Sequence, residues 1–358
     1  MQTYLSSRPA TFEPARQLVM AQGWNAMSYQ ILNEGIQHWF SSHGDAVVGF
    51  VRHAGVRVVA GAPICSHERL AAVVEEWEAE SHRAGENVCY FGAGSRLEAL
   101  WSQRRRAKVL LGAQPVWDPG RWDDVVREHT SLRAQFNRAR NKGVRISEWD
   151  SRRGTHDAAL HACLRHWLQC KSLPPLHFLV EPNLLSNLRD RRLWVAQVGA
   201  TIAGFCVLTP VPARRGWLVE QIVRHRDAPN GTTESLLDHA MRAVSHEAQY
   251  LTLGFTPLSL RDEPTTTPRW LRWTLHWLRA HGQRFFNFAG LEAFKTKFQP
   301  SEWEPIYVLT NRHNFSPQDF YAITAAFAAT SPWHLLARTG IKAVAQEYQW
   351  LQQRVRSR

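Results

Sequence analysis

The sequence is poor in cysteine and has no Cys-x-x-Cys pair. Its five cysteines, an odd number, are Cys65, Cys89, Cys163, Cys170 and Cys206. This spacing offers neither a disulfide framework nor a zinc site, so reduced, mostly buried thiols of a cytoplasmic protein are expected. His161 and His166 lie five residues apart without neighbouring carboxylate ligands, and we expect no metal. Walker and G-x-S-x-G sequences are also missing.

Long apolar segments are scarce as well. The first residues lack the apolar core of a signal peptide. The run most similar to a membrane span, residues 193–212, has Gly199 between two β-rich stretches, which favours a buried hairpin. We therefore expect no transmembrane helix.

Acidic residues are too few to balance the basic ones. The 358 residues include 43 Lys and Arg against 31 Asp and Glu, a net charge of +12. Such an excess favours a polyanionic partner, either nucleic acid or an anionic membrane face. A solvated basic surface without a partner is the alternative.

The order of expected elements suggests a duplication. A hairpin over residues 46–60, a helix over 67–85 and a strand after it are followed by a second hairpin over 194–208, a strand, a helix and another strand. This favours an α/β (α+β) protein built from two copies of one unit. The predicted divisions are residues 1–148, 149–315 and a helical extension over 316–358.

Two lysines lie in an aromatic segment, "FNFAGLEAFKTKFQP", residues 286–300. We expect a strand over 284–290, a sharp turn at Gly290 and two helical turns after it. Lys295 and Lys297 differ by two positions, so they cannot share one helical face. Either one of them enters a cleft, or both lie at the rim of an apolar helix face with their charges in water.

A strand, a tight turn and a helix start follow one another over residues 220–236. The strand carries Glu220 and Arg224, and we expect Thr232 or Thr233 to cap a helix that begins near Glu234. Free amides at a helix start bind anions. Gly231 alone does not provide the glycine spacing of a coenzyme A pyrophosphate loop.

Two further segments are basic. The first, residues 131–146, fits phosphate contacts to a structured RNA or a solvated helix face, and its basic side chains include Arg133, Arg138, Arg140 and Lys142. The second, residues 268–281, has tryptophans on one helical face and arginines on the other. This pattern is typical of a helix at an anionic lipid interface and also of a packed surface helix.

Several segments together resemble the phosphatidylglycerol lysyltransferase C-terminal family. The segment "FNFAGLEAFKTKFQPSEWEPIYVL" is similar to its closing signature, and "LTLGFTPLS" and "RDAPNGTTESLL" resemble two others. "SLRAQFNRARNKGVRI" and "VVGFVRHAGVRVVAGAPI" match more loosely. The resemblance spans residues 28 to 310, in the order of the family.

The resemblance implies two tandem acyltransferase-like (GNAT) domains, each a mixed twisted sheet flanked by helices. It implies transfer of an aminoacyl group from aminoacyl-tRNA to a lipid hydroxyl, as in phosphatidylglycerol modification, without a cofactor. The implied catalytic residues are Lys295, Lys297, Glu220 and Arg224; the implied substrate-binding residues are Glu234, which would hold the donor's α-ammonium group, Asn287, Gly290, Gly254 and Ser259.

The chain also departs from the family pattern. Gln221 and Ala62 stand where the family has aspartate, and the membrane domain of the well-known members is not in the sequence. An acceptor such as a soluble amine or hydroxylamine is therefore one alternative. An acyl-CoA-dependent N-acyltransferase and a non-catalytic RNA-binding protein are two more. We expect a cytoplasmic protein that works at the inner face of the membrane if its acceptor is a lipid.

Overall fold

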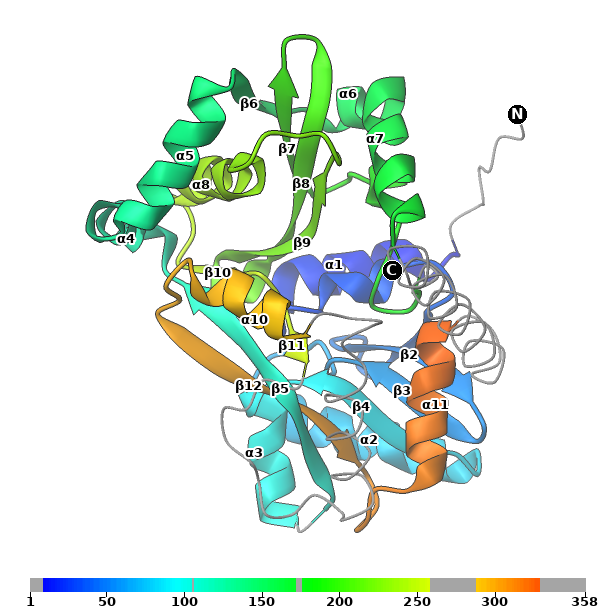
Figure 1. Cartoon of the computed structure of the whole chain (residues 1–358). Coiled ribbons are helices and arrows are strands. Elements are labelled where there is room, and N and C mark those ends of the chain that lie inside the picture. Colours follow the sequence, from blue (N-terminus) through cyan, green and yellow to red (C-terminus); the bar gives the residue numbers. More distant parts are fainter. Residues whose placement is uncertain (1–8, 105, 172–175, 258–287, 329–358) are drawn as a thin grey trace, which may run out of the picture.

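The computed structural model describes residues 9–104, 106–171, 176–257 and 288–328, and Figure 1 shows their arrangement. Three of the sequence predictions lie outside these residues: the tryptophan-rich helix over 268–281 and the side chains of Ser259 and Asn287. The predicted helical extension is described only through residue 328.

The first half contains the predicted hairpin, crossover helix and parallel strand. Strands β2 (Val47–His53) and β3 (Val56–Ala60) pair antiparallel, and helix α2 (Leu70–Arg83) leads to β4 (Asn87–Ala93), which pairs with β3 in parallel. Val73, Val74 and Trp77 of α2 are fully buried. Their spacing places them on one helical face, as the sequence indicates.

The second half repeats this order. Strands β7 (Arg192–Val198) and β8 (Thr201–Val211) form the predicted hairpin, followed by β9 (Gly216–Arg224), helix α8 (Thr232–Val244) and β10 (Tyr250–Thr252). β10 pairs with β9 in parallel, as β4 pairs with β3. The duplication expected from the sequence is therefore present in the described elements.

The other elements connect or cover these units. The remaining strands are β1 (Gln37–Phe40), β5 (Lys108–Trp117), β6 (Val144–Trp149), β11 (Thr256–Pro257) and β12 (Glu302–Thr310). The remaining helices are α1 (Phe12–Gln22), α3 (Ser95–Arg104), α4 (Trp122–Glu128), α5 (Thr130–Asn141), α6 (Ser151–His156), α7 (Ala158–Gln169), α10 (Phe288–Thr296) and α11 (Pro317–Ala328), with short 3-10 turns η1 (Tyr29–Leu32), η2 (Pro119–Arg121), η3 (Leu184–Ser186) and η4 (Pro212–Arg214).

Within the described residues all strands belong to one mixed sheet. Its order is β1-β2-β3-β4-β12-β5-β10-β9-β8-β7-β6, with β11 paired to β5. β12 comes from the end of the chain and lies beside β4, while β5 comes from the first half and lies beside β10 (Figure 1). Each half thus takes one strand from the other. The division at residue 148 falls inside β6, which pairs with β7, and it stays a prediction.

Helices cover both faces of this sheet. In the first half α2 and α3 pack on one face and α1 and α11 on the other. In the second half α4, α5 and α8 pack on one face and α7 on the other. The α/β fold with helices flanking a large mixed sheet is thereby confirmed. In the part of the chain that the structure describes, no helix has the length and apolarity needed to span a bilayer.

Two local predictions are wrong. Helix α10 already begins at Phe288, so the described end of the expected strand over 284–290 is helical, and Gly290 makes no sharp turn. Helix α8 begins at Thr232 rather than near Glu234, and its first turn has no side-chain cap. The Thr232 hydroxyl instead donates to the Pro229 carbonyl at 2.7 Å, because the chain enters the helix through Gly231 with φ +91°.

Candidate functional site

The parallel strands β9 and β10 separate soon after they meet. They pair over three residue pairs, and the last joins Thr252 to Leu218. The chain then turns at Gly254, whose φ is +69° and where a Cβ would lie 3.2 Å from Leu218 Cδ1. In the described structure, no strand accompanies β9 on this side from Val219 onward. Ligands of open α/β sheets bind where the carboxyl ends of parallel strands diverge.

Lys295 lies buried beside this point. Its Nζ donates to the Gly254 carbonyl at 2.7 Å and to the Phe255 carbonyl at 3.0 Å, and the residue is 4% exposed. Burial lowers the pKa of Lys295 to about 7, because a low dielectric disfavours the charged form. A neutral amine has two N–H groups and one lone pair. The two carbonyls would use both N–H groups and leave the lone pair as a proton acceptor.

Lys297 lies on another face of the same segment, as the spacing of two predicts. Its Nζ forms an ion pair with Glu234 Oε1 at 2.5 Å and lies 4.7 Å from the Phe294 ring centre and 5.3 Å from that of Phe298. Aromatic faces attract a cation and also limit its contact with water. Glu234 belongs to the first turn of α8, where the helix dipole favours a carboxylate.

Glu220 occupies a separate, buried cluster. Val207 pairs with Gln221 while Leu208 pairs with Val219, so Glu220 is the extra residue of a β-bulge in β9. Its carboxylate accepts from Arg191 Nε at 3.0 Å and from the Thr209 hydroxyl. Bulges in sheets often lie next to active sites. No contact among the described residues joins this cluster to the two lysines.

Arg224 and Gln221 mark the far end of β9. The Arg224 guanidinium donates to the Ala228 carbonyl at 2.6 Å and to Asn230 Oδ1 at 3.2 Å, so it holds the turn that leads into α8. Gln221 donates to the Pro182 carbonyl at 3.1 Å, and its Oε1 is buried without a partner.

The predicted RNA-binding residues lie on or just after α5, and α5 packs against the start of α8. A Cβ at Gly231 would lie 2.2 Å from the Gln135 carbonyl oxygen, which shows how closely the two helices approach. Arg138, Arg140 and Lys142 are exposed. Arg133 differs, because its guanidinium donates to carbonyls at the end of α4, at 2.9 Å for Val126.

The structure therefore joins some predicted site residues and leaves others apart. Lys295 contacts Gly254, and Lys297 contacts Glu234, while Gly290 lies five residues before Lys295 in α10. The sequence analysis missed Arg191. It stands in an arginine-rich stretch, and no local signal distinguishes it from its neighbours.

Comparison with models of known protein families found a match over most of the chain. The model described as "Phosphatidylglycerol lysyltransferase, C-terminal" matches residues 16–310. A phosphatidylglycerol lysyltransferase of Bacillus subtilis (strain 168) is 23% identical over 309 residues, which are 85% of this chain and 35% of that protein. The chain thus spans about a third of that relative's length.

Two solved structures have a similar fold. The C-terminal domain of a putative lysylphosphatidylglycerol synthetase from Agrobacterium fabrum has a TM-score of 0.74 at 21% identity, covering 90% of this chain and 98% of that one. L-PGS from Bacillus licheniformis has a TM-score of 0.73 at 19% identity, covering 88% and 95%.

Proposed function

Since this chain belongs to the phosphatidylglycerol lysyltransferase C-terminal family, we propose that it transfers an aminoacyl group from charged tRNA to the hydroxyl of a lipid such as phosphatidylglycerol. The observation that carries this proposal is the contact between the basic helix α5 and the start of α8, where Glu234 and Lys297 meet. A lipid acceptor implies that the protein works at an anionic membrane surface.

The donor would approach along α5. Exposed Arg138, Arg140 and Lys142 would contact phosphates of the tRNA, and the tRNA's aminoacylated end would reach the start of α8. Only Oε1 of Glu234 is used by Lys297 within the described structure. Oε2 would therefore accept the α-ammonium group of the donor, which fixes the position of the ester carbonyl.

Transfer needs a proton acceptor and a cation near the ester. The neutral amine of Lys295 would take the proton of the acceptor hydroxyl as its oxygen attacks the ester carbonyl carbon. The Lys297 ammonium would stabilise the oxyanion that forms. The carbon–oxygen bond to the terminal ribose then breaks, and Lys295 returns the proton to the leaving ribose oxygen. Glu220 and Arg224, the other predicted catalytic residues, would hold β9 and its turn in place.

A transfer assay tests this function. The protein is incubated with a panel of tRNAs carrying radiolabelled amino acids and with phosphatidylglycerol vesicles, and label is followed into the lipid and aqueous phases. Label should enter the lipid phase, and ribonuclease should abolish it. Lys297→Met and Lys295→Met should each lower kcat by about 100-fold or more. Lys108→Met, a lysine that pairs with Glu98 in the first half, is the matched control.

Each other outcome contradicts a stated part of the proposal. Label in a soluble acceptor, found in the aqueous phase, would replace the lipid by a small amine or hydroxylamine; Gln221, in place of the family's aspartate, favours this second candidate. Activity that survives ribonuclease and requires an acyl-CoA would exclude tRNA as donor. Bound tRNA without transfer, unaffected by either lysine variant, would leave a binding protein only.

A further inference from the structure

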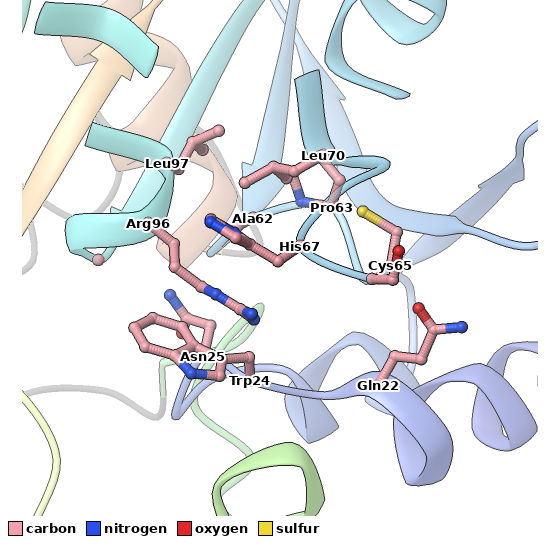
Figure 2. A pocket seen from close by; sticks show the side chains of 12 residues that line it. Gln22, Trp24, Asn25, Ala62, Pro63, Cys65, His67, Leu70, Arg96 and Leu97 are labelled. Carbon is pink, nitrogen blue, oxygen red and sulfur yellow. The ribbon is translucent and has the colours of Figure 1, made fainter. Parts of the chain in front are cut away.

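A shallow cleft lies in the first half, where β3 and β4 end. The empty space at this cleft is about 370 Å³, a figure that includes open solvent, and its lining includes Trp24, Asn25, Cys65, His67 and Arg96 (Figure 2). Gly61 directly follows β3, and Gly92 is the next-to-last residue of β4; their φ angles are +73° and +83°. The cleft therefore occupies, in the first half, the position that the β9–β10 divergence occupies in the second.

Arg96 is the charged group of this cleft, and the acidic residue that attracts it, Glu68, does not line the cleft. Its guanidinium lies 4.7 Å from the Trp24 ring centre, and Figure 2 shows it reaching from α3 over that ring. Within the described structure no carboxylate comes within ion-pair distance of Arg96, and none of the twelve lining residues is Asp or Glu. Burial lowers the pKa of Arg96, and the attraction of Glu68 offsets only part of this effect, because a charge held partly out of water is costly.

A second arginine beside Trp24, Arg214, shows the contrast. Arg214 lies 4.8 Å from the same ring centre, but both of its terminal nitrogens donate to Glu304, at 2.9 and 2.6 Å. Its charge is neutralised within the protein. Arg96 is held at a similar distance from the same indole, and among the residues that the structure describes none accepts a hydrogen bond from its guanidinium.

Three kinds of donor converge on the space in front of Arg96. The guanidinium offers a fork of N–H groups, and the exposed His67 lies at the rim of the cleft. Arg96 is the second residue of α3, a helix of 10 residues that begins directly after Gly94. The Leu97 and Glu98 amides donate to the Gly94 carbonyl, and the Ser95 and Arg96 amides precede this first bonded turn. The terminal oxygens of a phosphoryl group, three in a monoester and two in a diester, can accept from such a set. Helix starts favour phosphate for the same electrostatic reason.

We propose that this first-half cleft binds a phosphoryl group, held by Arg96 against Trp24. Two sources share this chemistry: a small soluble phosphate ester and the phosphodiester of a lipid headgroup. The apolar wall formed by Ala62, Leu70 and Leu97 would contact the carbon part of either. The site is distinct from Lys295 and Lys297, so it does not depend on the function proposed above.

Calorimetry and vesicle flotation test the proposal on the full chain. Calorimetry uses inorganic phosphate and glycerol 3-phosphate, and flotation compares phosphatidylglycerol vesicles with phosphatidylcholine vesicles. Binding in at least one arm should weaken tenfold or more in Arg96→Gln. Arg96→Lys keeps the charge but loses the fork and should fall between the two. Arg104→Gln, on the same helix and paired with Glu75, should bind as the original chain does.

The two experiments distinguish a soluble phosphate ester from a lipid headgroup, and controls identify variants that have not folded. Binding of the soluble phosphates identifies an ester site, and loss confined to phosphatidylglycerol flotation identifies a headgroup site. Circular dichroism and thermal unfolding of each variant show whether it is folded. The proposal is overturned if the original chain binds in neither arm, or if folded Arg96→Gln and Arg104→Gln bind equally well. Transfer activity is not a readout, so failure here leaves the proposed transferase unaffected.

Discussion

The burial of Lys295 predicts a specific pH dependence of stability. Its ordinary pKa is 10.5, and in the folded protein it is about 7. Below pH 7 both folded and unfolded chains carry the proton, and the folded state bears the full cost of a buried charge. Between pH 7 and 10.5 the folded chain has lost the proton while the unfolded chain keeps it. The unfolded state then binds more protons, so the free energy of unfolding rises with pH.

The size of this effect follows from the same two values. One pKa unit corresponds to about 1.36 kcal/mol, so the cost is at most roughly 5 kcal/mol below pH 7 and is lost towards pH 10.5. Lys295→Met removes the titrating group. The free energy of unfolding of Lys295→Met minus that of the original chain should therefore fall by about 2 kcal/mol from pH 7 to pH 9.

Urea unfolding at pH 6, 7, 8 and 9 measures this difference. The substitution also removes hydrogen bonds to Gly254 and Phe255. That loss changes the free energy of unfolding by the same amount at every pH, so it leaves the slope against pH unchanged. Lys108→Met retains Lys295 and should keep the slope of the original chain. Parallel pH curves for Lys295→Met and the original chain would refute the reasoning, since Lys295 would then titrate alike in both states.

Three other perturbations test separate parts of the molecule. Arg138→Glu with Lys142→Glu should weaken tRNA binding and lower the slope of log affinity against log salt by about 1 per removed charge, as filter binding at several salt concentrations would show; an unchanged slope would remove α5 from the interface. At Gly231, where φ is +91°, Gly231→Ala places a Cβ 2.2 Å from a carbonyl oxygen of α5. It should lower the free energy of unfolding in urea by about 2 kcal/mol or more. An unchanged value would mean that α5 and α8 are not in close contact. Arg191→Met leaves the Glu220 charge buried without its arginine and should lower the free energy of unfolding by about 3–5 kcal/mol. Adding Glu220→Gln to that variant should restore part of the loss. No recovery would indicate that the unpaired charge is not its cause.

Local structure could be predicted where local forces decide it. β3 spans Val56–Ala60 as the β-branched run indicates, and a hairpin forms around Gly199, as its place between two β-rich stretches predicts. The sequence analysis named no strand over Lys108–Trp117 and none within the polar stretch around β6. Both pair with residues distant in the chain, and strand pairing of this kind leaves no local pattern to find.

The candidate site was predictable in part. The spacing of Lys295 and Lys297 already requires that their amines have different surroundings. Spacing could not identify the partners of the two amines, because Gly254 and Glu234 lie 41 and 63 residues away. The family resemblance named both residues for the site, but as substrate-binding residues and not as contacts of the lysines. Arg133 was grouped with the RNA-binding residues on charge alone. The structure assigns its guanidinium to the carbonyls of α4, a use that composition cannot distinguish from a free surface charge.

The exchanged strands decide how firmly the lysines are held. β5, encoded in the first half, carries Trp117, whose Nε1 donates to the Phe298 carbonyl at 2.8 Å just after α10. Ser301 N donates to the Val116 carbonyl at 2.9 Å, and β11, which follows Gly254, pairs with β5 at Ala113. The two segments that position Lys295, its own helix and the carbonyls it contacts, are therefore attached to the same strand. Because β12 lies between that strand and β4, the geometry of the second-half site depends on the first half, even though its site side chains belong to the second.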